Sequence, residues 1–395
     1  MAKTYSRIDL TDYFEQFAIQ SKKHPGGTGM RSFYAALSSL KDNKELETFL
    51  KEVVASRMEL NPQHFSTLFP RAIQYMLYIT HNNREYPKYS TEEWVKFILK
   101  LVQPKSVYGQ EVKYILATRN TNSTISARYL GPKIIINGLY PDQKVHVTEF
   151  GASIGFGIRE LEHKKHVGIT VKDMTPDKII SRLGVTHLNI AGGVAIDREN
   201  LESDVAWVAS CSVYFQEIDK LEELLEAYAH YKKSSKIKLH QADMLDIELV
   251  VEEALIKPEK VQIPLASSDV SMALTALYEL SSLERTIALE NMRKVTKPNG
   301  VVIVQDFFGL GDVFGESAVL SYLPLKDLGV EDNRAMIQFK DFYGEHTYRT
   351  LVFMLDGEQR FNRVFEVFRW NHARCEYLYP GSDYNKFLWM LAKES

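Results

Sequence analysis

The segment Val145-His-Val-Thr-Glu149-Phe-Gly151-Ala-Ser153-Ile-Gly155-Phe-Gly157 carries the most information about the fold. It begins as an apolar strand that ends in an acid, and a turn of small residues follows. A helix is predicted from Ile158 onward. In such strand–turn–helix units, small residues let a ligand approach the backbone, and the free N–H groups of the helix face its polar or anionic atoms. The segment therefore predicts an α/β protein with a ligand site beyond the end of this strand.

Short apolar runs and helical segments alternate along the chain after residue 130. Further strands are predicted at Lys236–Leu239, Val261–Leu265, Val301–Gln305, Thr350–Leu355 and Lys386–Leu391. Helices are predicted at Gln216–Lys232 and Ser282–Val295, and the second places Leu283, Ile287, Ala288, Met292 and Val295 on one side. This alternation predicts a largely parallel sheet with helices on both faces.

The first 115 or so residues have helical patterns instead. Asp12 and Glu15 have the spacing of a capping box, and Lys44–Met58 is rich in helix-forming residues. Ser90 and Glu93 form a second capping box. An apolar stripe follows that box at helical spacing: Trp94, Phe97, Ile98 and Leu101. The segment therefore predicts an all-helical N-terminal part.

Length and composition set limits on organisation and function. The chain has 395 residues, a net charge of −3 and a pI of about 6.4, so we expect no nucleic-acid partner. No apolar run approaches the length of a membrane span, and two cysteines cannot form a disulfide framework, which predicts a cytoplasmic protein. The length predicts two domains: a helical one at 1–130 and an α/β one at 131–395.

Three interpretations of the glycine-rich turn remain open. In the first, Glu-x-Gly-x-Ser-x-Gly forms a cofactor loop. In the second, Ser153 is the nucleophile of a G-x-S-x-G elbow, with Asp306 and then His346 or His372 in the required order. In the third, the segment is a plain tight turn. The elbow does not explain Glu149, and this favours the cofactor loop.

Three segments together resemble the Rossmann-like S-adenosylmethionine-dependent methyltransferases. They are Glu149-Phe-Gly151-Ala-Ser153-Ile-Gly155, Ala242-Asp243-Met244, and Met292–Val304 with its Lys297-Pro298-Asn299-Gly300 turn, and they occur in the family's order. The resemblance implies a Rossmann-like methyltransferase sheet and S-adenosylmethionine as cofactor. It also implies a set of cofactor-binding residues: Glu149, Gly151, Ala152, Ser153, Gly155, Asp197, Asp243 and Met244.

The chain is also similar to a bacterial group of methyltransferase-like proteins of unknown function, over roughly residues 10 to 310. The likeness rests on Asn120-Thr121-Asn122 before the loop, on Gly193-Val-Ala-Ile-Asp197 and on Trp207. It implies that Asn122 lies near a substrate. The chain departs from this group where Ser123 follows Asn122 and where the nearest arginine is Arg128.

The acid that holds the ribose hydroxyls in such proteins has two candidates here. By simple alignment its position falls near Ala195, which leaves Asp197 or Asp173 to take this role. Ser268 follows the run Val261–Leu265 and is expected at the same edge of the sheet, as a substrate residue or as a helix cap.

The sequence assigns no catalytic residue. His240, His346 and His372 are candidate bases without a means of choosing among them. His163 and His166 have the spacing of a zinc pair on a helix, but no third ligand accompanies them, and we expect no metal.

The leading interpretation is an S-adenosylmethionine-dependent methyltransferase acting on a small molecule, with the helical domain covering the crevice. One alternative is a protein of the same fold that binds a ligand or partner without catalysis. The other is a serine hydrolase that uses Ser153.

Overall fold

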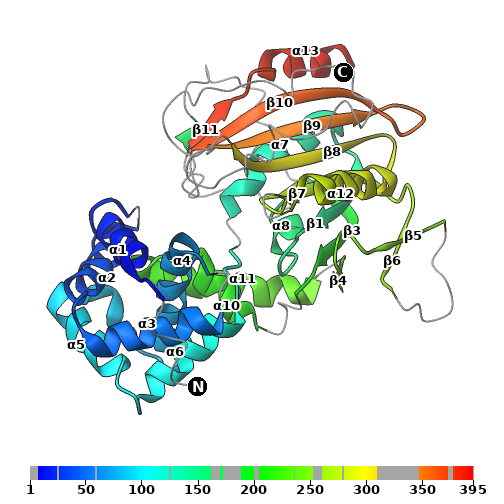
Figure 1. Cartoon of the computed structure of the whole chain (residues 1–395). Helices are drawn as coiled ribbons and strands as arrows, with labels where there is room; N and C mark the ends of the chain where they lie inside the picture. Colours follow the sequence, from blue (N-terminus) through cyan, green and yellow to red (C-terminus); the bar gives the residue numbers. More distant parts are fainter. Residues whose placement is uncertain are drawn as a thin grey trace. The chain divides into compact units, whose positions relative to one another are not determined.

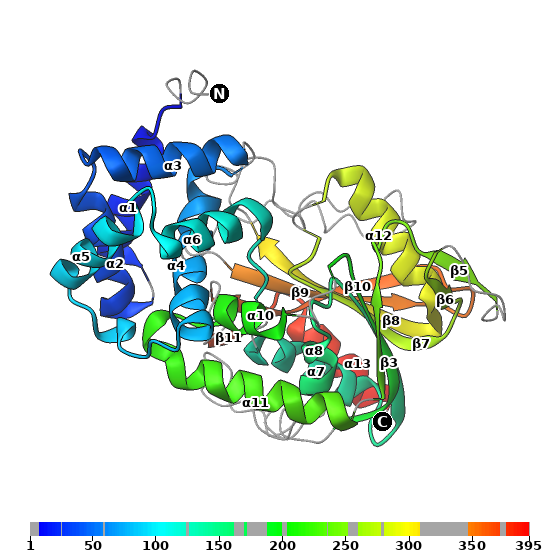
Figure 2. The same ribbon diagram turned by 90° about the horizontal axis from the view of Figure 1, so that it is seen from below.

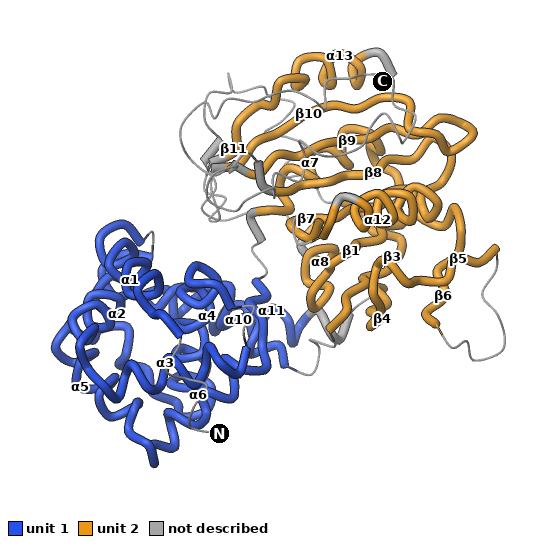
Figure 3. The backbone as a smooth tube through the Cα atoms, viewed as in Figure 1, with its two compact units in different colours: residues 1–124, 204–230 blue, residues 125–203, 231–395 orange. Residues whose placement is uncertain are grey.

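The computed structural model describes residues 8–24, 26–57, 60–123, 126–161, 170–171, 188–199, 204–234, 236–251, 260–277, 280–308, 347–371 and 377–394. The chain forms two compact units, shown in Figure 3. Unit 1 comprises residues 1–124 and 204–230, and unit 2 comprises residues 125–203 and 231–395. The chain thus returns to the first unit after residue 203, where the sequence predicted a single division near residue 130.

Unit 1 is helical, as expected for the N-terminal part. Its elements are α1 (Thr11–Lys23), α2 (Gly27–Ser39), α3 (Lys44–Ser56), α4 (Pro62–Gln74), a π-helical turn (Tyr75–Thr80), a 3-10 turn (Tyr86–Lys88), α5 (Thr91–Leu101), α6 (Val107–Thr118), α10 (Val205–Ser212), a 3-10 turn (Phe215–Glu217) and α11 (Ile218–Ser234), within which the boundary between the units falls.

Local capping explains where several of these helices begin. Ser90 and Glu93 form the predicted capping box at α5, because each side chain accepts a backbone N–H of the other residue. The prediction for Asp12 was wrong: α1 begins at Thr11, and Asp9 Oδ1 accepts the Thr11 N–H at 2.9 Å. Asp12 lies inside the first turn, where its negative charge interacts favourably with the positive end of the helix dipole.

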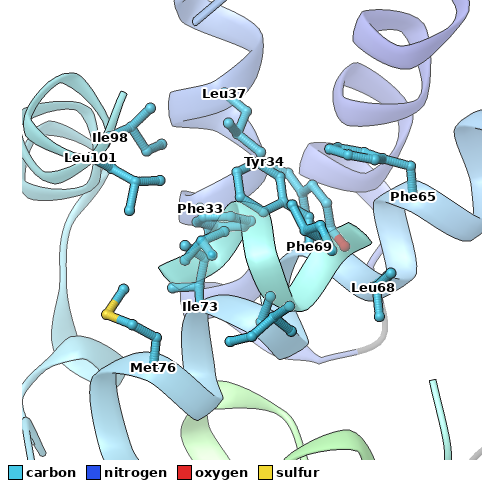
Figure 4. Close-up of a cluster of buried hydrophobic side chains, with 14 of the residues drawn as sticks. Phe33, Tyr34, Leu37, Phe65, Leu68, Phe69, Ile73, Met76, Ile98 and Leu101 are labelled. Atoms are coloured by element: carbon cyan, nitrogen blue, oxygen red, sulfur yellow. The ribbon is translucent and has the colours of Figure 1, made fainter. Parts of the chain in front are cut away.

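Aromatic side chains fill the core of unit 1 (Figure 4). Phe33 and Trp94 meet edge to face at 5.0 Å between ring centroids, and Phe215 stacks on Trp94 at 5.3 Å. The amide of Gln74, which is fully buried, donates to the carbonyls of Ser210 and Val213. These contacts explain why residues 204–230 belong to the helical unit.

The main sheet of unit 2 has nine described strands (Figure 1). They are β1 (Lys144–Phe150), β2 (Thr170–Val171), β3 (Asn189–Asp197), β4 (Ile237–Gln241), β7 (Ser268–Leu274), β8 (Thr296–Phe308), β9 (Thr347–Leu355), β10 (Phe361–Asn371) and β11 (Tyr377–Pro380). Their order is β2-β11-β10-β9-β8-β7-β1-β3-β4. β5 (Glu248–Val250) and β6 (Gln262–Pro264) form a separate pair.

The order of the strands is that of a Rossmann-like sheet. From β4 through β3, β1 and β7 to β8 all neighbours are parallel, and β9 then joins β8 antiparallel. The chain moves from β1 to β3 on one side and later to β7 on the other, so the topological switch point lies at β1. Ligands of open α/β sheets bind beyond the carboxyl ends of the strands at such a point.

Helices cover both faces of this sheet, as predicted (Figures 1 and 2). One face carries α7 (Leu130–Leu139), α8 (Phe156–Leu161) and α13 (Tyr384–Glu394), and the other carries α12 (Ser282–Val295). A 3-10 turn, η4 (Ser126–Tyr129), leads into α7. None of the described helices combines the length and the apolar character that crossing a bilayer requires.

Two predicted details of this unit were wrong. Lys386–Leu391 is part of α13 and not a strand, because Phe387 and Met390 are one helical turn apart and both face the core. In α12, Leu283 is 72% exposed, whereas Leu289, which the predicted stripe omitted, is fully buried.

Candidate functional site

The glycine-rich turn after β1 has the backbone conformation that its sequence demands. Gly151 and Gly155 have φ angles of +72° and +65°, in the left-handed region that favours glycine. A Cβ atom on Gly151 would lie 2.4 Å from the Cβ of Ala276, so the loop after β7 excludes any side chain there. Ser153 adopts φ +54°, a conformation that costs a residue with a Cβ about 1 kcal/mol. The turn is therefore strained at Ser153 and held in place by its neighbours.

Asp197, at the end of β3, holds this turn. Its Oδ2 accepts the N–H of Ser153 at 2.7 Å, and its Oδ1 accepts the N–H of Glu199 at 3.0 Å. The side chain is half-buried. Asp197 thus joins the glycine-rich turn to the end of the neighbouring strand β3.

Glu149 lies at the end of β1 and is completely buried. Its Oε1 accepts the Tyr129 hydroxyl at 2.7 Å, and its Oε2, also buried, has no hydrogen-bond partner among the described residues. Burial raises the pKa of Glu149 to about 8, the Tyr129 hydrogen bond opposes that rise, and the charge of Asp197 adds to it. The carboxyl group is therefore mostly neutral at pH 7.

Two residues of η4, Tyr129 and Arg128, contact residues at the carboxyl ends of β1 and β7. Tyr129 reaches Glu149, and Arg128 donates from Nη1 to Thr275 Oγ1 at 2.5 Å. The guanidinium of Arg128 also lies over the Tyr348 ring, 5.5 Å from its centroid. The sequence alone distinguishes Arg128 only as the nearest arginine after Asn122. No sequence pattern points to Tyr129, because its role depends on where η4 packs.

Two of the predicted cofactor-binding residues, Asp243 and Met244, follow the end of β4. Met244 is buried, and its methyl group would be 3.4 Å from a Cβ placed on Gly151. Asp243 accepts the Leu245 N–H at Oδ1, at 2.9 Å, and so stabilises the turn that follows β4. The structure thus brings Met244 to the glycine-rich turn and gives Asp243 a local structural role.

The other members of the predicted cofactor set belong to the turn itself. Ala152 is buried, and its N–H donates to the Ile196 carbonyl on β3 at 3.0 Å. Ser153 is buried as well, and its Oγ has no hydrogen-bond partner among the described residues. Glu149, Gly151, Ala152, Ser153, Gly155, Asp197 and Met244 therefore form one cluster in unit 2.

The two predicted substrate residues belong to different parts of the chain from this cluster. Ser268 is the first residue of β7, at its amino end, and its Oγ lies 2.6 Å from Thr148 Oγ1. The prediction that it shares the edge of the glycine-rich turn was wrong, because the run before it, β6, belongs to the separate two-stranded sheet. Asn122 belongs to unit 1, where its backbone N–H faces the buried thiol of Cys211.

Several predicted candidates lie outside the described residues: Asp173, His163, His166, His346 and His372. Asp306 is buried at the end of β8, and its Oδ2 accepts the Leu277 N–H at 2.9 Å. His240 lies on β4 beside Ile196 of β3. Within the described part of the chain no group of His, Cys, Asp and Glu side chains is arranged to hold a metal ion.

Comparisons with known proteins add little to this geometry. No protein-family model matches the chain, and no curated protein matches it. Among solved structures, the YcgJ protein from Bacillus subtilis is 13% identical, with a TM-score of 0.26, and the match covers 46% of this chain and 51% of that one. A putative S-adenosylmethionine-dependent methyltransferase from Listeria monocytogenes is 11% identical, with a TM-score of 0.24 and coverages of 46% and 55%.

A third structure, an S-adenosylmethionine-dependent methyltransferase from Mesorhizobium loti, is 10% identical, with a TM-score of 0.24 and coverages of 44% and 52%. The chain thus spans about half the length of each of these structures. A likeness of this extent carries no functional conclusion, and the fold assignment rests on the order and direction of the strands.

Proposed function

We propose that this protein is an S-adenosylmethionine-dependent methyltransferase that acts on a small molecule. The observation that carries the proposal is the Asp197–Ser153 hydrogen bond, which ties the glycine-rich turn to the end of β3 at the switch point of the sheet. This is where open α/β sheets bind nucleotides and related ligands. An acid at the end of β3, next to β1 in the sheet, is suited to the paired hydroxyls of a ribose.

The residues of the cluster fit the parts of this cofactor. Asp197 would accept the ribose hydroxyls, because its carboxylate lies at the end of β3 beside the glycine-rich turn. Met244 with Gly151 would meet the adenine ring. Glu149 would face the amino acid end of the cofactor. The cofactor supplies a methyl group on a positively charged sulfur, and the protein contributes by orienting donor and acceptor and by excluding water.

The direct test is calorimetric titration of the purified protein with S-adenosylmethionine and S-adenosylhomocysteine. We expect micromolar dissociation constants for the wild type and at least ~10-fold weaker binding for Asp197→Ala, because two hydrogen bonds to a charged group are lost. Asp246→Ala is the matched control, since Asp246 is an exposed acid of the same unit. Absence of binding by the wild type at millimolar concentrations would contradict the proposal.

A protein that binds the cofactor without turnover is distinguished by the next measurement. Candidate small-molecule acceptors are incubated with the protein and S-adenosylmethionine, and formation of S-adenosylhomocysteine is followed. An active enzyme forms it only in the presence of an acceptor, and Asp197→Ala lowers the rate in parallel with its affinity.

The left-handed φ of Ser153 is the one observation that favours a serine hydrolase, because a nucleophile elbow is strained in this way. Its Oγ is buried, and the two histidines that such an elbow would use here, His346 and His372, lie outside the described residues. Ser153→Ala separates the two functions. A methyltransferase keeps most of its cofactor affinity, while a hydrolase loses all esterase activity.

A further inference from the structure

We propose that Tyr129 is a positioning residue of this site: its hydroxyl fixes Oε1 of Glu149 and leaves Oε2 to meet a cationic group of the ligand. The inference rests on the proposed function, since S-adenosylmethionine carries an ammonium group and a sulfonium group. It adds a residue from outside the glycine-rich turn, and it makes binding of a cation depend on the protonation of Glu149.

The packing of Tyr129 gives the first argument. The Tyr129 hydroxyl donates to Glu149 Oε1 at 2.7 Å, and both side chains are buried. The tip of the Tyr129 ring lies directly against Gly157 in α8, where a Cβ atom would be 1.9 Å from Cζ and 2.0 Å from the hydroxyl oxygen. The absence of a side chain at residue 157 is therefore what admits Tyr129 to Glu149.

The state of the second carboxyl oxygen gives the next argument. Oε2 of Glu149 is buried and has no hydrogen-bond partner among the described residues, which is costly for a group in a protein interior. Since Oε1 accepts the Tyr129 hydrogen, the proton of the neutral acid resides on Oε2. A ligand cation that takes the place of this proton would remove the cost.

The groups around Glu149 determine the balance between its neutral and anionic forms. From η4, Tyr129 and Arg128 favour the anionic form, as does the N–H of Ile158 in α8. From β3, Asp197 opposes it, and burial opposes it more strongly still. The Cα partners of Glu149 on its two neighbouring strands, Ala195 and Met272, carry no charge.

Two consequences follow from this balance. A cation bound beside Glu149 stabilises the anion, so at pH 7 the protein releases a proton as the ligand binds. Loss of the Tyr129 hydrogen bond raises the pKa of Glu149 further, because one of the groups that stabilise the anion is removed. Binding of the cation at pH 7 then becomes weaker.

The first measurement needs no ligand. The carboxyl carbon of Glu149 is followed by NMR in protein with 13C-labelled glutamate, with Glu149→Gln identifying the signal. We expect a midpoint near pH 8 in the wild type and a midpoint higher by about half a unit to one unit in Tyr129→Phe. Gly157→Ala should shift the midpoint in the same direction, because its methyl group displaces the ring without altering either partner.

Tyr140→Phe is the matched control. Tyr140 is a mostly buried tyrosine of the same unit, and its hydroxyl donates to the Asp269 carbonyl at 3.1 Å, near the amino end of β7. Its removal should leave the midpoint of Glu149 unchanged. Circular dichroism verifies that each variant is folded. If Gly157→Ala does not fold, the midpoint in Tyr129→Phe alone tests whether the Tyr129 hydroxyl stabilises the Glu149 anion.

The second measurement is calorimetry with S-adenosylmethionine at pH 7 in two buffers of different ionisation enthalpy. We expect release of up to one proton in the wild type, none in Glu149→Gln, and about 3- to 10-fold weaker binding in Tyr129→Phe. An unchanged Glu149 midpoint in Tyr129→Phe would overturn the role of Tyr129. If the wild type binds no S-adenosylmethionine, the proposed function fails instead, and the titration without ligand still decides whether Tyr129 fixes Glu149.

Discussion

A single buried acid gives this protein a pH dependence with a definite sign. The pKa of Glu149 is about 8 in the folded chain, against an ordinary value of 4.5. Between these values the unfolded chain has lost the proton and the folded chain has kept it, so the free energy of unfolding falls as the pH rises. Below pH 4.5 Glu149 is protonated in both states, and its burial no longer lowers the free energy of unfolding.

Glu149→Gln removes this loss of stability while the side-chain oxygen still accepts the Tyr129 hydroxyl. We expect the variant and the wild type to melt alike near pH 4.5, and the variant to gain roughly 1 kcal/mol for each pH unit up to about 8. Thermal unfolding at a series of pH values checks this. A difference in melting temperature that stays constant across the series would contradict the raised pKa.

At this scale the sequence predicted which residues lie together when they are close along the chain. Glu149, Gly151 and Gly155 follow one another along the chain, and a strand–turn–helix pattern brings them together without help from distant segments. Tyr129 and Ser268 depend on how separate segments pack, on η4 and on the register of β7. A pattern within the sequence cannot show that packing, so Tyr129 was missed and Ser268 was misplaced.

Helix α12 shows what local signals can and cannot specify for an element. The prediction of Ser282–Val295 is confirmed: Ser281 and Glu284 form a capping box at its start, and β8 begins at Thr296, directly after its last residue. The buried face was predicted only in part: periodicity alone leaves the stripe uncertain by a residue, and packing on β7 and β8 selects Leu289 over Leu283. The short apolar run of α13 fits both the helical period and the strand period, and the sequence therefore predicted a strand where the structure has a helix.

The two leucines of α12 form a matched pair for measurement. Leu289→Ala should lower the free energy of unfolding by about 2–4 kcal/mol, because it leaves a cavity between α12 and the sheet. Leu283→Ala should change it by less than about 0.5 kcal/mol, because that side chain is 72% exposed. Chemical denaturation followed by circular dichroism compares them, and equal losses would show that the helix presents another face to the sheet.

Across the whole molecule, the segment that returns to the helical unit is the feature that sequence patterns describe least well. Residues 204–230 follow three strands of unit 2 along the chain but complete the core of unit 1. Length and composition give the number of domains, and they cannot show that one domain is interrupted by another. The evidence for the interruption is tertiary: Trp207 donates from its indole to the Asn120 carbonyl at 2.9 Å, and Phe215 is enclosed by Phe33 and Trp94.

Hydrogen exchange on the full chain tests this division. Phe215→Ala should lower the stability of unit 1 by about 3–5 kcal/mol, since a fully buried aromatic ring is lost, and exchange should accelerate in α2 and α5. Phe353→Ala, a fully buried ring of β9, is the counterpart and should accelerate exchange in β8 and β10. If residues 204–230 were only a connection between strands of unit 2, Phe215→Ala would leave the protection of α2 and α5 as it is in the wild type.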